Sequence, residues 1–165
     1  MSATLDVDTS QMVTDATSQS ISEIFETMAS EPAKQVSGSC VQDPEWVTES
    51  GKDQLTITLS LSGDLQGTIG LCLPAAVACR WTEDISGEAA KEVDQMVIDA
   101  SGELGNMVVG GAKRRLEGFD LKIGLPNVIF AGREAVAFQS RLSPICMKFE
   151  YAGHQFDVFV ALAPA

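Results

Sequence analysis

The sequence predicts an α+β fold in which two long helices pack on one face of an antiparallel sheet. Apolar residues follow a helical period, then two alternating runs, then a second helical period and finally several more alternating runs. Helices and hairpins therefore come in blocks, whereas a parallel sheet requires strands and helices to alternate strictly. Each half of the chain is a helix followed by a hairpin, which also suggests a weak internal repeat.

Length, composition and charge limit the classes of protein to consider. The chain has 165 residues, of which 45% are hydrophobic and 21% are charged, as is typical of one globular domain. No apolar run approaches the roughly 20 residues that span a bilayer, and the polar, acidic start does not resemble a signal peptide. The formal charge of -12 repels nucleic acid and anionic membrane surfaces. We therefore expect one cytoplasmic domain over residues 1–165, with residues 1–12 flexible and with neither nucleic acid nor membrane as a partner.

Cysteine and histidine spacing gives no indication of a metal site. The four cysteines show no CxxC spacing, and we interpret Cys72 and Cys79, which lie in apolar sequence, as core thiols. The single histidine, His154, cannot supply a zinc ligand set and is expected in a turn. One histidine also makes a hydrolase with an ordinary nucleophile and base hard to build.

The chain is predicted to begin with a helix and a long connection. Residues 14–29 place apolar side chains at helical spacing, with Thr14 or Asp15 available as the N-cap. Residues 30–53 are rich in Pro, Gly, Ser and charge. They predict a surface connection with a short strand around residues 40–41.

A hairpin, a short helix and a long helix follow. Residues 55–61 and 66–73 alternate as two strands joined by a Ser-Gly-Asp turn. Pro74 can open a short helix. Ser86 is a candidate N-cap for the long helix, which Gly118 would end. Four further runs are expected to be antiparallel strands: 121–131, 135–142, 145–151 and 155–163.

The long helix contains the stretch DASGELGNMVVGGAKRRL, residues 99–116, which separates into two faces. With an advance of about 100° per residue, one side is apolar or small and is expected to face the sheet: Val97, Ser101, Leu104, Gly105, Val108, Ala112 and Leu116. The opposite side is polar or open: Glu92, Asp99, Glu103, Asn106, Gly110 and Arg114. Asp94 falls near the buried side and does not fit this arrangement unless the helix begins close to it.

The glycines and like charges of this helix need an explanation other than helix stability. A glycine inside a helix costs roughly 0.5–1 kcal/mol relative to alanine, and like charges four residues apart, such as Asp99 and Glu103, also destabilise a helix. We expect Gly105 to let the helix lie close to the sheet, and Gly110 to clear room beside Asn106 for another molecule. Spacing alone leaves two interpretations of the polar row open, a solvated face or a site.

The same helix resembles the signature of a known family. Asp99, Glu103 four residues on and Asn106 three further are followed by a basic helix end and by Leu125-Pro126 in the next strand. This pattern resembles that of the CheC/CheX/FliY phosphatases of bacterial chemotaxis, and the filler residues of GELGNMVVGGAKRRL are similar as well. The resemblance covers most of the chain and implies the CheC/CheX-like fold with two pseudo-symmetric halves.

Within that family, the CheC type carries two such sites on two helices and the CheX type carries one. Aligning Glu23 of the first helix with Glu103 places Glu26, or Thr27 after a one-residue slip, where the asparagine belongs. The chain therefore resembles the single-site CheX type. This type implies a homodimer formed through the sheet, and the apolar run 155–163 is a candidate for a strand that needs a partner edge.

The resemblance implies a phosphatase acting on a phosphorylated response regulator of the CheY type. Asn106 would hold the attacking water in line with phosphorus, and Glu103 would pair with a lysine of the regulator. Asp99, Gly110 and Arg114 would extend the partner-binding surface. The protein would need no cofactor of its own, because the regulator supplies Mg²⁺. Two alternatives stay open: a non-catalytic adaptor or scaffold of the same fold, and a structural module of a flagellar switch.

Overall fold

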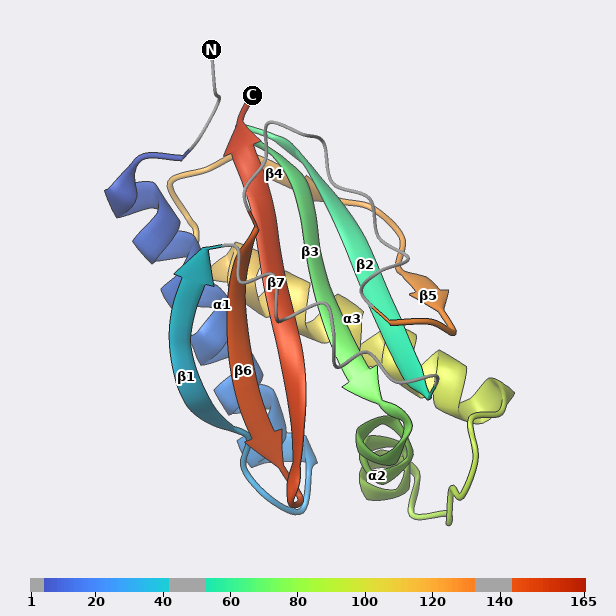
Figure 1. Ribbon diagram of the computed structural model, residues 1–165. Coiled ribbons are helices and arrows are strands. Elements are labelled where there is room, and N and C mark those ends of the chain that lie inside the picture. The colour runs from blue at the N-terminus through green and yellow to red at the C-terminus, as the bar shows by residue number, and fades with distance from the viewer. Residues whose placement is uncertain (1–4, 42–52, 133–143) are drawn as a thin grey trace.

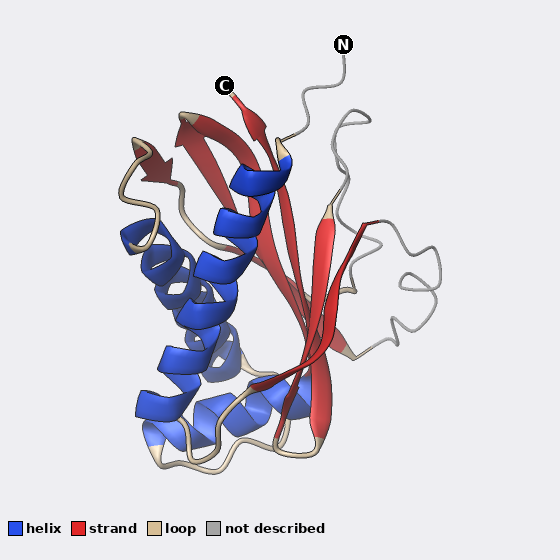
Figure 2. Ribbon diagram, turned by 90° about the vertical axis from the view of Figure 1, so that its left-hand side faces the viewer, coloured by secondary structure: helices blue, strands red, loops and turns tan. Residues whose placement is uncertain are grey.

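The computed structural model describes residues 5–41, 53–132 and 144–165 of the chain. These residues form three helices and a seven-stranded antiparallel sheet (Figure 1). In chain order the elements are α1 (Val7–Met28), β1 (Lys34–Val41), β2 (Gln54–Gly63), β3 (Leu65–Pro74), α2 (Ala75–Ser86), α3 (Gln95–Arg114), β4 (Leu121–Ile123), β5 (Asn127–Ile129), β6 (Ile145–Tyr151) and β7 (His154–Pro164). Figure 2 shows the helices on one side of the sheet. The predicted α+β class, with long helices on one face of an antiparallel sheet, is confirmed.

The sheet has the strand order β1-β6-β7-β3-β2-β4, and β5 also pairs with β2. The predicted hairpin is confirmed, since β2 and β3 pair in antiparallel register from Gln54 and Pro74 at one end to Leu61 and Gly67 at the other. Short strands β4 and β5 follow one another along the outer flank of β2. This flank lies next to α3 (Figure 1), the helix for which a polar face was predicted.

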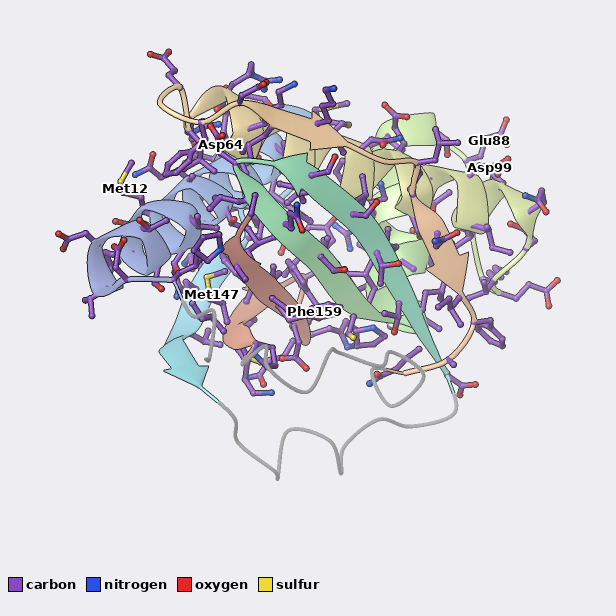
Figure 3. The ribbon with its side chains drawn as sticks, turned by 90° about the horizontal axis from the view of Figure 1, so that it is seen from above. Met12, Asp64, Glu88, Asp99, Met147 and Phe159 are labelled. Atoms are coloured by element: carbon purple, nitrogen blue, oxygen red, sulfur yellow. The ribbon has the colours of Figure 1, made fainter. Side chains whose placement is uncertain are left out.

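Strand β7 lies in the interior of the sheet, between β6 and β3. Val158 and Val160 belong to the core under the helices. Phe159 is buried on the opposite face (Figure 3). Its ring lies over Gly70. The prediction that the run 155–163 needs a partner edge is therefore wrong. The run is apolar because it is central, with neighbours along both edges and buried side chains on both faces.

The remaining strands differ from the predictions in their limits. Residues 121–131 form two short strands in place of one. The strand expected around residues 40–41 is the end of the longer β1, which pairs with β6. The predicted strand 135–142 lies outside the described residues. His154 is the first residue of β7, so the turn is formed by residues 152–153 rather than by the histidine.

Helix α1 begins at residue 7 rather than at residue 14. Asp6 is its N-cap, because the carboxylate accepts hydrogen bonds from the backbone N–H of Thr9 at 2.7 Å and from its hydroxyl at 3.0 Å. Thr14 and Asp15, which were predicted as caps, lie inside the helix. Residues 7–12, which we expected to be flexible, are its first turns.

The boundary between α2 and α3 also differs from the prediction. Ser86 is the last residue of α2, and Gly87 ends that helix in the left-handed conformation with φ of 73°. The N-cap of α3 is Asp94, whose carboxylate accepts a hydrogen bond of 3.0 Å from a backbone N–H of the first turn. This role explains the position of Asp94 near the buried side of the helix. At the other end, α3 stops at Arg114, before the predicted Gly118.

Close packing fixes α3 against the sheet and against α1. Every residue assigned to its sheet-facing side is buried. A Cβ atom at Gly105 would lie 2.6 Å from Cγ2 of Ile57 in β2, so only glycine allows the observed approach. A Cβ atom at Gly111 would collide with the hydroxyl of Ser20 in α1, which donates a 2.7 Å hydrogen bond to the Val108 carbonyl. The expectation for Gly105 is confirmed.

Cys72 and Cys79 are both buried, in agreement with their interpretation as core thiols. Cys79 belongs to the core under the helices, whereas Cys72 lies on the opposite face of the sheet beside Phe159. Within the described parts of the chain, no helix is both long and apolar enough to cross a membrane.

A nearly buried carboxylate, Asp84 of α2, connects this helix with the end of β6 and with the segment that follows α1. Its side chain is 8% exposed. It accepts hydrogen bonds from the Ser30 backbone N–H at 3.1 Å, from the Arg80 guanidinium at 3.2 Å and from the Tyr151 hydroxyl. Burial disfavours the charged carboxylate, but these hydrogen bonds outweigh burial and lower the pKa of Asp84.

Asp84→Asn is expected to lower the free energy of unfolding by about 1–2 kcal/mol near neutral pH. The folded-state pKa of Asp84 lies below its unfolded value of about 3.9, so its carboxylate stabilises the fold above that pH. This stabilisation is lost as the pH falls through the folded-state pKa. Urea unfolding of both proteins between about pH 7 and pH 3 measures the effect. A difference in stability that does not shrink on acidification would contradict this role.

Candidate functional site

The exposed face of α3 carries three polar side chains that the sequence singled out. Asp99, Glu103 and Asn106 are spaced by four and then three residues, so they project from the same side of the helix over two turns. All three are exposed. The helix can present them because its other side is fixed on the sheet at Gly105.

An open hollow of about 360 Å³ lies between this face and the segment around β5. Its lining residues are Ile98, Asp99, Gly102, Glu103, Asn106, Pro126 and Val128. Strand β5 lies beside α3 (Figure 1), and Asp99 lies in the N-terminal half of that helix (Figure 3). The structure thus brings Asp99, Glu103 and Asn106 together with Pro126, the remaining element of the motif.

Glu103 and Asn106 are available to an incoming molecule. Among the residues that the structure describes, neither side chain has a hydrogen-bond or ion-pair partner. Asp99 differs, because its carboxylate accepts a hydrogen bond of 2.8 Å from Gln95 Nε2. The carboxylate of Glu103 and the amide of Asn106 are neighbours on the helix surface and together offer acceptors and donors. Within the described ranges, no group of three or more His, Cys, Asp or Glu side chains is arranged to hold a metal ion.

Gly102 lets the β5 segment approach the helix. The residue is buried, and a Cβ atom there would lie 3.5 Å from Val128 Cγ2 and 3.9 Å from Pro126 Cγ. The segment therefore packs on α3 one turn before Asn106, which places the proline at the edge of the hollow. Sequence reasoning missed Ile98, Gly102 and Val128 as lining residues. Gly102 had a signal in the unusual glycine content of the helix, whereas Ile98 and Val128 had none.

Gly110 and Arg114 continue the same row but do not line the hollow. Gly110 lies one turn beyond Asn106, or about 6 Å along the helix axis. The space above it is open, since the nearest atom to a Cβ at this position would be Arg114 Nη1 at 4.0 Å. Arg114 is exposed at the end of the helix. Their part in partner binding stays a prediction.

Helix α1 carries no equivalent of the pair of side chains on α3. Glu23, which aligns with Glu103, forms an ion pair with Arg115 at the end of α3. The same guanidinium donates a 3.0 Å hydrogen bond to the Gly111 carbonyl. The Thr27 hydroxyl donates to the backbone carbonyl of Glu23 at 2.8 Å. In the described part of α1, the glutamate is therefore already engaged, which agrees with a single site on α3.

Several solved structures share the fold of this chain. A CheC-like superfamily protein from Shewanella sp. PV-4 superimposes with a TM-score of 0.81 at 20% identity, covering 96% of this chain and 99% of that one. CheX from Vibrio vulnificus has a TM-score of 0.79 at 23% identity, covering 91% and 98%. CheX from Borrelia burgdorferi, in a complex with CheY, BeF3 and Mg²⁺, has a TM-score of 0.76 at 17% identity, covering 96% and 99%. These similarities establish the CheC-like fold.

The sequence comparison identifies the family. No curated protein is similar to the chain at a significant level. The chemotaxis phosphatase CheX family, in contrast, matches residues 55–150, which run from β2 through α3 to the penultimate residue of β6 and make up more than half of the chain. The chain therefore belongs to the CheX family of chemotaxis phosphatases.

Proposed function

We propose that the protein is a cytoplasmic phosphatase that dephosphorylates a phosphorylated response regulator of the CheY type. The observation that carries the proposal is that Glu103 and Asn106 lie together in a hollow bounded by Pro126. Both side chains are exposed, and neither has a partner among the described residues. Membership of the CheX family supports the reaction. The complex of Borrelia burgdorferi CheX with CheY supports the class of partner.

The chemistry requires little more than an oriented water molecule. Asn106, whose amide can both donate and accept, holds a water in line with the phosphorus of the regulator's phosphoaspartate. The water oxygen forms the new bond to phosphorus, and the bond to the aspartate oxygen breaks with its electron pair left on the carboxylate. A water proton ends on the released phosphate. The Mg²⁺ of the regulator neutralises charge, so this chain has only to position the water.

Asp99, Gly110 and Arg114 extend the docking surface on both sides of the central pair. These side chains form a row on α3 that runs from the Asp99 carboxylate to the Arg114 guanidinium, over about 22 Å of the helix axis. Complementary charges on the regulator then decide the direction in which it lies across α3. Gly110 leaves this surface open between the two ends.

Glu103→Ala is expected to weaken binding of the phosphorylated regulator about tenfold and to slow hydrolysis. In the proposal, its carboxylate pairs with a lysine of the regulator, and a charge-assisted hydrogen bond of this kind is lost in the variant. A fluorescence titration of the regulator against both proteins measures the affinity. Glu26→Ala, which removes an exposed carboxylate from α1, is the matched control and should bind normally. Unaltered binding by Glu103→Ala would remove the docking role.

The function itself is tested by phosphate release from each phosphorylated response regulator encoded in the same genome. Acceleration by catalytic amounts of the protein is the expected result. Stoichiometric, phosphorylation-dependent binding without release would indicate an adaptor or scaffold. Binding that is indifferent to phosphorylation would indicate a structural module of a flagellar switch.

The homodimer that the resemblance implies is part of the same proposal. Because β7 lies inside the sheet, its edges cannot form a strand-mediated interface. Among the described strands, β1 has an edge away from the hollow, whereas the β4–β5 flank adjoins the docking surface. We therefore assign a dimer contact of this kind to the side of β1.

A further inference from the structure

A one-residue bulge separates β4 from β5 and displaces Leu125 from the sheet. Ile123 of β4 pairs with Leu61 of β2, and Asn127 of β5 pairs with Thr58. Three residues of the outer strand, 124–126, therefore face two residues of β2. Such an insertion bends the strand and changes the direction of a side chain, and it is frequent at sheet edges and next to active sites.

The three bulge residues suit this geometry. Gly124 donates its backbone N–H to the Ser60 carbonyl at 2.8 Å, and a Cβ atom at Gly124 would collide with the Ser60 hydroxyl. Pro126 has no N–H to donate, so it suits a position where pairing is interrupted. Between them, the side chain of Leu125 is left 89% exposed. The bulge is thus held on β2 by its first residue and presents its second to solvent.

Leu125 directly precedes Pro126, which lines the hollow together with Glu103 and Asn106. The polar groups of the hollow can orient a partner, but they offer little apolar area. In protein interfaces most of the affinity comes from a few side chains that become fully buried on binding. An exposed leucine next in the chain to a residue that lines the hollow supplies such a side chain.

We propose that Leu125 is the apolar anchor of the docking surface and inserts into an apolar recess beside the phosphorylation site of the response regulator. This inference rests on the proposed function. A regulator that brings its phosphoryl group to Asn106 must also cover Pro126, because both line the same hollow, and Leu125 is the residue before Pro126 in the chain. Continuity with the hollow therefore identifies the regulator, rather than a second copy of this chain, as the occupant.

Leu125→Ser is expected to raise KM for the phosphorylated regulator about tenfold and to change kcat less than about twofold. The reason is that the leucine adds binding area without touching the reacting atoms. Leu125→Met, which restores an apolar side chain of similar volume, should recover a KM close to that of the unmodified protein. Val7→Ser is the matched control, because Val7 is 84% exposed at the start of α1 and should leave both constants unchanged. Thermal unfolding should show equal stability for all variants.

The outcomes separate this inference from the proposed function. If the unmodified protein accelerates phosphate release and Leu125→Ser has an unchanged KM, the anchor is overturned and the phosphatase stands. If the protein binds the phosphorylated regulator without releasing phosphate, the same variants are compared by titration, and tenfold weaker binding by Leu125→Ser alone supports the anchor while the catalytic role fails. If no regulator binds, both proposals fall.

Discussion

Asn106→Ala is expected to lower kcat for dephosphorylation of the regulator by about 100-fold or more. The effect is large because the proposed mechanism gives this chain one chemical task, the orientation of water, and a single amide performs it. Removal of one preorganised hydrogen-bonding group from other hydrolytic sites costs about 10²–10³ in kcat. The fold should not change, since the side chain is exposed and has no partner among the described residues. Alanine is also the better helix former.

The measurement is multiple-turnover phosphate release, with circular dichroism and thermal unfolding as checks on the fold. Gln19→Ala is the matched control, because it removes an exposed amide from α1, far from the hollow in sequence and on another helix. It should retain full activity. A kcat for Asn106→Ala within about threefold of the unmodified value would assign the water-orienting role to another group.

Gly105→Val is expected to lower the free energy of unfolding by about 3 kcal/mol or more. A Cβ atom at this position would already lie 2.6 Å from Ile57 Cγ2 and 2.9 Å from Leu59 Cδ1, and both neighbours are fully buried in β2. Ile57 is β-branched and stiff, so the strain cannot be relieved by a rotamer change. The helix would have to move away from the sheet. Valine has a better helix propensity than glycine by only roughly a few tenths of a kcal/mol, which cannot compensate for the strain.

Gly110→Val is the matched comparison, since it places the same side chain on the same helix in open space. Its stability should stay within about 0.5 kcal/mol of the unmodified protein. Urea unfolding of the two variants measures the difference directly. Equal stabilities would show that α3 can shift on the sheet without cost, and the close approach at Gly105 would then not explain that glycine.

The two faces of α3 and the hairpin of β2 and β3 could be predicted from the sequence. A helix turns by about 100° per residue, so spacing alone assigned Leu104 and Val108 to the sheet and Glu103 and Asn106 to the solvent. In the structure Leu104 and Val108 are buried, and Glu103 and Asn106 are exposed, in agreement with that assignment. Alternation and a short turn are equally local, so the hairpin required no knowledge of the rest of the chain. The motif on this helix also led to the family that the comparison confirmed.

The ends of the helices and the neighbours of each strand depend on contacts between distant parts of the chain. Ser86 and Asp94 are both good N-caps by type, and the choice of Asp94 depended on Gly87 ending α2 and on a separate connection before α3. The apolar run 155–163 fits either a covered edge or a central strand. Its pairing with β3 and β6, strands on opposite sides of the long α3 in the sequence, placed it in the centre.

The same limit applies to the candidate site. The polar row of α3 could be predicted, but the hollow exists because β5 pairs with β2 and brings Pro126 and Val128 to Gly102. The exposure of Leu125 depends on an offset between two strand registers that becomes visible only once β2 is paired. Side-chain periodicity is a property of one element, whereas strand order, bulges and hollows depend on contacts between segments far apart in the chain.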